Sequence, residues 1–65
     1  MDIVERRDAA LIHDWPVKFI EYNSCMNESK YAITYPDGSV KERWAWEQKE
    51  AMLHLAKLEW IVYGK

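Results

Sequence analysis

The stretch "KYAITYPDGSVKERWAW", residues 30–46, decides the fold because it contains a strand, a tight turn and a returning strand. Pro36 presets φ at the first turn position and Gly38 supplies a positive φ at the last, so "PDG" predicts a β-turn. Aromatic and aliphatic residues alternate with smaller ones over residues 30–35, and residues 39–46 run back. The stretch therefore predicts an antiparallel hairpin.

Alternation along the returning strand predicts which of its side chains share a face. Val40, Glu42 and Trp44 fall on one face, and Lys41 and Arg43 fall on the other.

Two tryptophans close this stretch, one on either side of Ala45. In a continuous strand the two indoles would share a face, whereas a turn into a helix would separate them. We predict that Trp44 packs in the core and that Trp46 lies at its rim, available to a partner.

The N-terminal segment, residues 2–13, predicts a helix. Asp2 is a suitable N-cap, and Glu5 follows it at the spacing of a capping box. Pro16 prevents the helix from continuing and favours extended backbone at the residue before it.

A strand is predicted at residues 17–23, followed by a polar loop over residues 23–29. Phe19 lies on one face of this strand, and Ile20 and Tyr22 lie on the other. Since both faces of the strand are apolar, we expect either that other elements cover both faces or that the outer face is an exposed apolar surface prone to association.

A final helix is predicted from Trp46 or Glu47 to Tyr63. Its apolar residues recur at amphipathic spacing. The stripe consists of Ala51, Leu55, Leu58 and Val62, widened by Met52 and Ile61.

These elements predict a single α+β domain over residues 1–65, in the order α-β-β-β-α. A three-stranded antiparallel sheet with its apolar face under two helices is a stable two-layer arrangement. So short a chain buries only about 60% of its unfolded surface, and its single cysteine excludes an internal disulfide. Large aromatic residues must supply the core, which we expect to contain Phe19, Tyr31 or Ile33, and Trp44 or Trp60.

The charge pattern argues against a generic binder of phosphate backbones, because the formal net charge is −2 and acids and bases are interspersed. No apolar run approaches the length of a membrane span or the core of a signal peptide. Beginning at Met1, the sequence predicts a complete small cytosolic gene product.

Reactive side chains are few, and we expect neither an enzyme nor a metal or cofactor site. The groups of interest are His13 beside Asp14, His54 and Cys25. Catalysis needs several convergent groups in a pocket, and zinc sites need paired ligand spacing. His13 instead suits a helix end, and His54 suits the surface of the last helix.

Three segments carry a resemblance to a known family. "HDWPVKFIEY" leads from helix to strand through a proline, "YAITYPDGSVKERW" forms the second hairpin, and "EQKEAMLHLAKLEW" opens the last helix. In this order and length the chain resembles the double-stranded-RNA-binding domain. The resemblance implies the α-β-β-β-α fold and contacts to duplex RNA.

The family's contact residues map unevenly onto this chain. At the start of the last helix the resemblance implies phosphate contacts, for which Lys49 is the remaining cation, while Glu47 stands at the family's serine. Glu5 or Asp8 would take the ribose contact of the first helix. The loop at residues 23–29 lacks the family's Gly-Pro-x-His-type segment.

Small DNA-binding domains of the AP2 and integrase arm types share the strand–strand–strand–helix core but lack the leading helix. They use the exposed sheet face, here Lys41 and Arg43. A nucleic-acid-binding function, our alternative hypothesis, would draw on the cations Arg6, Arg7, Lys41, Arg43, Lys49 and Lys57.

Our leading hypothesis is a non-enzymatic protein that acts by protein–protein contact, because Trp, Tyr and Arg are enriched at interface hot spots. Such a protein suits an inhibitor or an adaptor, as among phage-encoded antagonists of bacterial defence such as anti-CRISPR proteins, which act in the host cytoplasm. Homodimerisation through an exposed aromatic face is compatible with it. The expected contact residues are Trp46, Tyr35, Tyr22 and Arg43.

Overall fold

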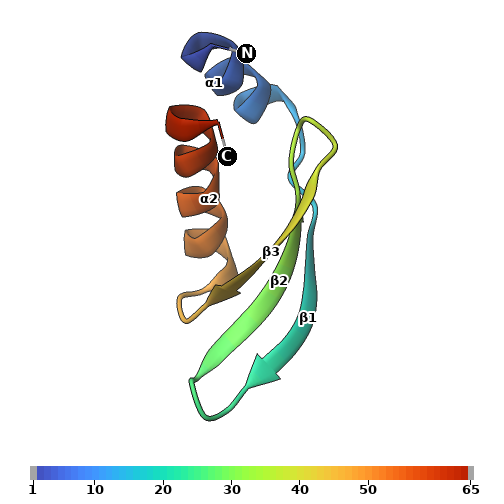
Figure 1. Cartoon of the computed structure of the whole chain (residues 1–65), viewed down its shortest axis with the longest axis vertical. Coiled ribbons are helices and arrows are strands. Elements are labelled where there is room, and N and C mark those ends of the chain that lie inside the picture. The colour runs from blue at the N-terminus through green and yellow to red at the C-terminus, as the bar shows by residue number, and fades with distance from the viewer. Residues whose placement is uncertain (1, 65) are drawn as a thin grey trace.

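The computed structural model describes residues 2–64 and confirms the predicted α+β order. Helix α1 spans Ile3–Ile12, and helix α2 spans Lys49–Tyr63. Between them lie β1 (Val17–Asn23), β2 (Glu28–Thr34) and β3 (Val40–Ala45), paired antiparallel in the order β1-β2-β3. Helix α2 runs beside the sheet, and α1 lies across the C-terminal end of α2 (Figure 1).

Local sequence signals set most of the element boundaries. The side chain of Asp2 accepts a hydrogen bond from the backbone N–H of Glu5 at 2.9 Å and caps α1. The "PDG" turn forms as predicted, with Gly38 at φ +88° and its N–H bonded to the Tyr35 carbonyl. Gly64, at φ +72°, ends α2 in the left-handed conformation that glycine adopts without steric cost.

Two boundaries differ from the prediction. Strand β2 begins at Glu28, because Asn27 adopts the left-handed conformation (φ +53°) and shortens the predicted loop to a tight turn. The Asn23 side chain supports this turn by accepting hydrogen bonds from the N–H groups of Cys25 and Met26. Helix α2 begins at Lys49, later than predicted, because Gln48 retains extended backbone geometry.

The first hairpin contains one irregularity. Phe19 pairs with Tyr31 and Glu21 pairs with Lys30, so Ile20 is an extra residue and forms a β-bulge. Because a bulge interrupts the ladder at the outer strand, it reduces the tendency of this sheet edge to pair with another strand.

Three aromatic rings pack against one another where the ends of α1, β2 and α2 meet. The Trp15 ring lies 4.8 Å from the Tyr35 ring and 5.5 Å from the Trp60 ring, centroid to centroid. The Trp15 indole N–H donates to the Ala10 carbonyl at 3.3 Å, so its polar atom is satisfied within the core. The buried core consists of Ala9, Ala10, Trp15, Ile33, Tyr35, Ala45, Met52, Ala56 and Trp60.

Two aromatic residues predicted for the core are exposed instead. Trp44 pairs with Lys30, while Arg43, one residue earlier, points toward α2, so Trp44 lies on the sheet face away from that helix. Phe19 is exposed because α1 lies beyond the end of the sheet and does not cover β1. Ile33 and Trp60 are buried as predicted.

Only the widening residues of the stripe predicted on the last helix contact the core: Met52 is buried and Ile61 packs against it, while the four central residues are exposed. Helix α2 buries Met52, Ala56 and Trp60, while Leu55 and Leu58 are exposed. The helix carries two apolar stripes at helical spacing. The sheet selects the one in which a small alanine permits close approach between two large side chains.

Candidate protein-binding surface

Exposed aromatic residues gather at the end of β3. Trp46 is 78% exposed and Trp44 is 41% exposed, while Ala45 between them is buried. Strand β3 ends at Ala45, and the chain turns immediately into the segment before α2. The prediction that Trp46 is exposed is therefore confirmed, and the prediction that Trp44 is buried is wrong. We call this pair the indole pair.

The side chain of Trp44 is held in place by its neighbours. The Lys30 ammonium lies 5.6 Å from the centroid of the Trp44 ring, and Lys30 also bonds to Glu42 at 3.0 Å. A cation over an indole face is attracted by the ring quadrupole. These contacts fix the Trp44 ring against the sheet without covering it.

Tyr22 lies at the same end of the sheet as the indole pair. It pairs with Ser29, and Ser29 in turn pairs with Ala45, so the three residues form one row across the strands. Tyr22 is exposed, and its hydroxyl bonds to the Asn27 side chain at 2.7 Å. The sheet register therefore brings Tyr22 and Trp46 to one end of the molecule.

Tyr35 is not part of this surface. It lies at the other end of β2, is only 7% exposed, and packs against Trp15. Burial raises the pKa of its phenol, an effect that the nearby positive charge of Arg43 partly opposes. In this position Tyr35 offers little surface for the partner contact that the sequence predicted.

Arg43 serves to join the sheet to α2. Its two terminal nitrogens donate to the two carboxylate oxygens of Glu59, at 3.0 and 3.1 Å. These hydrogen bonds are the main reason that the pKa of Arg43 lies above its usual value. A half-buried guanidinium already held in this way is poorly placed to contact a partner.

Of the six cations predicted for nucleic acid, Lys41 and Lys57 lie over the packed rings of Tyr35 and Trp15, at 4.8 and 5.8 Å, and the others are placed as follows. Arg6 donates to the Ile61 carbonyl at the end of α2, and Arg7 pairs with Asp8 at 3.5 Å. Arg43 pairs with Glu59. Lys49, exposed, begins α2, about 20 Å along the helix from the Arg6 contact.

The candidate catalytic groups also remain apart. His13 follows α1, His54 lies within α2, and Cys25 lies in the β1–β2 turn, all three exposed. Within residues 2–64 there is no group of three or more His, Cys, Asp or Glu side chains that could hold a metal ion. Neither described helix is long and apolar enough to cross a membrane.

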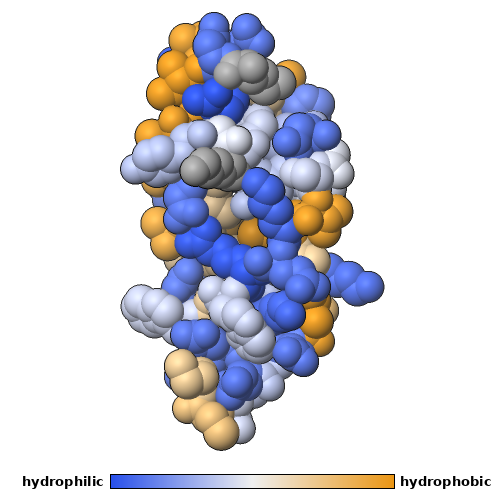
Figure 2. Space-filling model, viewed as in Figure 1, coloured by the Kyte–Doolittle hydropathy of each residue, from blue (hydrophilic) through white to orange (hydrophobic). Residues whose placement is uncertain are grey.

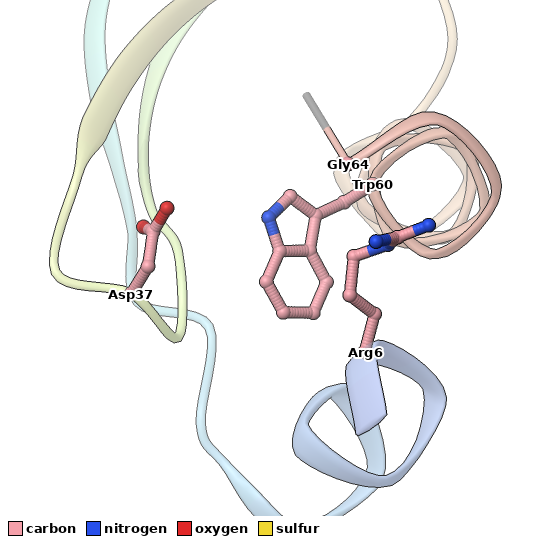
Figure 3. Close-up of a pocket in the computed structure, with 4 residues that line it drawn as sticks. All are labelled: Arg6, Asp37, Trp60 and Gly64. Carbon is pink, nitrogen blue, oxygen red and sulfur yellow. The ribbon is translucent and has the colours of Figure 1, made fainter. Parts of the chain in front are cut away.

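One hollow of about 320 Å³ lies where α1, the β2–β3 turn and the end of α2 meet. Arg6 and Asp37 stand on opposite sides of the Trp60 indole, and Gly64 lies above it in the view (Figure 3). Asp37 accepts hydrogen bonds from the backbone N–H and the hydroxyl of Ser39, which lower the pKa of its carboxyl. Because Arg6 and Asp37 are both engaged in holding the fold, the hollow offers little polar recognition to a ligand.

Comparisons with known proteins return no match to a family, to a curated protein or to a solved structure.

Sequence reasoning missed two features of the surface. It assigned Trp44 to the core, and it assigned the stripe containing Leu55 and Leu58 to the buried side of the last helix. A signal was present for the second, because the last helix carries more apolar residues than one face can bury.

Proposed function

We propose that this chain is a small non-enzymatic binding protein that acts by protein–protein contact. The observation that carries the proposal is the indole pair, in which Trp44 and Trp46 are exposed on either side of buried Ala45. Tryptophan is among the residues most enriched at interface hot spots. Large apolar side chains gathered on the surface of a small protein mark an interaction site.

The surroundings of the indole pair suit a protein partner. Lys30, which is paired with Glu42, lies over the Trp44 ring and restricts it, so less side-chain entropy is lost when a partner covers the ring. The same two charged residues supply a polar rim around an apolar centre, which is the usual arrangement of a protein interface. We expect the partner to offer an apolar recess for Trp46.

An inhibitor or an adaptor is the kind of binding protein that we favour. A chain of this size that acts by occupying a surface of another protein resembles, in its mode of action, the phage-encoded antagonists of bacterial defence such as anti-CRISPR proteins. A protein of that kind acts in the cytoplasm of the host cell.

Affinity capture with matched variants tests this proposal. The baits are the wild-type protein, Trp46→Ala, Trp44→Ala and, as a control, Leu11→Ala, which truncates an exposed apolar residue on α1. A specific partner should be retained by wild type and the control, lost with Trp46→Ala, and insensitive to moderate salt. Equal retention of every captured protein by all four baits would contradict the proposal.

The alternative is a diverged nucleic-acid-binding module for duplex RNA. Two observations favour it: the α-β-β-β-α order, and the exposed Lys49 in the first turn of α2. Fluorescence anisotropy with labelled duplex RNA, at low and physiological salt, tests it against Lys49→Ala and the control Lys18→Ala. Binding that falls steeply with salt and is lost only in Lys49→Ala supports the alternative. Absence of binding at low salt excludes it.

A further inference from the structure

The side of α2 that faces away from the sheet is apolar and exposed. We call Ala51, Leu55, Leu58 and Val62 the α2 seam. Leu55, Leu58 and Val62 are 43%, 45% and 51% exposed, and Ala51 is also exposed. At 100° per residue, the seam is centred about 130° around the helix from the buried residues Met52, Ala56 and Trp60. Helix α2 is thus apolar on two sides, and the fold covers one of them.

The spacing of the α2 seam is that of a coiled coil. Its residues follow one another at intervals of four, three and four, the d-a-d-a pattern of a heptad repeat. The seam extends about 16 Å along the helix axis. Side chains at this spacing interlock as knobs into holes with a second helix whose apolar residues repeat in the same way.

We propose that the partner helix is α2 of a second copy of this chain. The seam contains no ionisable side chain, and the acid on its flank, Glu59, is neutralised by Arg43. In a two-fold symmetric dimer each residue meets the same surface of its twin, so any charge in the patch would meet its like. A neutral, apolar seam pairs with itself without that repulsion.

The molecule exposes more surface and is more elongated than an average compact monomer of its size. Its accessible surface is 4682 Å², whereas a compact monomer of this mass exposes about 4,400 Å². Its radius of gyration is 12.3 Å and its extents are 39 × 17 × 16 Å, whereas a compact domain of this length has a radius of gyration of about 10.7 Å.

Apolar side chains are also exposed on α1. Figure 2 shows apolar side chains along the edge of the molecule that α1 and α2 form. Ile3, Val4, Leu11 and Ile12 of α1 are all exposed.

The oligomeric state in solution tests the proposal. The mass is measured by light scattering and sedimentation from low micromolar to several hundred micromolar chain. We expect wild type to approach twice the chain mass of 7.8 kDa as concentration rises. Leu58→Glu, which places two like charges across the seam, should remain at the mass of one chain. Val40→Glu adds the same charge at a position on β3 that is 62% exposed, against 45% for Leu58, and should dimerise like wild type.

Circular dichroism establishes that each variant is folded, and Leu58→Gln replaces Leu58→Glu if the charged variant unfolds. A wild type that stays at the mass of one chain throughout overturns the proposal, as does dimerisation that Leu58→Glu leaves intact. If wild type is monomeric and Leu58→Glu abolishes binding to a different protein, the seam is assigned to that protein instead of to a second copy. Trp46→Ala should leave the dimer intact, so failure of the proposed function and failure of the dimer are distinguishable.

Discussion

Arg43 and Glu59 form a paired hydrogen bond that ties β3 to α2, with both terminal nitrogens of the guanidinium on both carboxylate oxygens at 3.0 and 3.1 Å. The two residues are 16 apart in sequence and belong to different layers of the fold. A paired geometry of this kind positions the two elements as well as attracting them.

A double-mutant cycle on this pair should show a measurable coupling. Arg43→Met and Glu59→Gln should each lower the free energy of unfolding, and the coupling between them should be about 1 kcal/mol because the pair is partly exposed. For a domain of this size, that loss corresponds to about 4–8 °C in melting temperature. Urea unfolding of the four proteins gives the coupling. A value near zero would show that the pair adds nothing to stability.

Truncation of α2 should distinguish its two stripes. Met52→Ala removes a fully buried side chain and should cost about 2–5 kcal/mol, enough to leave so small a domain largely unfolded. Leu55→Ala should cost less than about 1 kcal/mol at concentrations where the chain is monomeric, because half of that side chain already contacts water. Thermal melts at low micromolar concentration compare the two. Equal losses would contradict the assignment of the buried stripe.

The Asp37 turn should contribute stability that depends on pH. Hydrogen bonds from Ser39 lower the pKa of the Asp37 carboxyl in the folded chain relative to the unfolded chain. A carboxyl with a depressed folded-state pKa stabilises the fold above its unfolded pKa, near 3.8, and this contribution is lost as pH falls through the folded value.

Asp37→Asn should therefore lower the urea midpoint at pH 6 and flatten its dependence on pH below about 4. Ser39→Ala, which removes the hydroxyl donor but keeps the backbone N–H, should fall between wild type and Asp37→Asn. Urea midpoints measured from pH 6 to pH 2 give the comparison. Identical pH profiles for wild type and Asp37→Asn would show that the turn does not contribute.

The four tryptophans should separate into two classes by quenching with iodide. Trp15 and Trp60 are buried, and Trp44 and Trp46 are exposed. The variant Trp44→Phe/Trp46→Phe should retain blue-shifted emission that iodide barely quenches. The variant Trp15→Phe/Trp60→Phe should emit further to the red and be quenched strongly. Similar quenching of both folded variants would refute the placement of the indole pair on the surface.

Much of the fold follows from local signals. The Asp2 cap, the stop at Pro16, the "PDG" turn and the glycine at the end of α2 each act within a few residues, so sequence reasoning places them correctly. Sequence reasoning about exposure was right at Trp46, where the chain leaves the sheet. It failed at Tyr35, whose burial depends on Trp15, twenty residues earlier in the chain.

The sequence by itself determined the order of the elements and which side chains share a face, because turns, caps and periodicity are local properties of the chain. Only the tertiary structure decided which face is inside. Packing of Trp15, Tyr35 and Trp60 at one corner places α1 at the end of α2 rather than over the sheet. That placement leaves the outward side of α2 and the far face of the sheet uncovered. Periodicity cannot reveal it, because a helix with two apolar stripes satisfies the same pattern whichever stripe is buried.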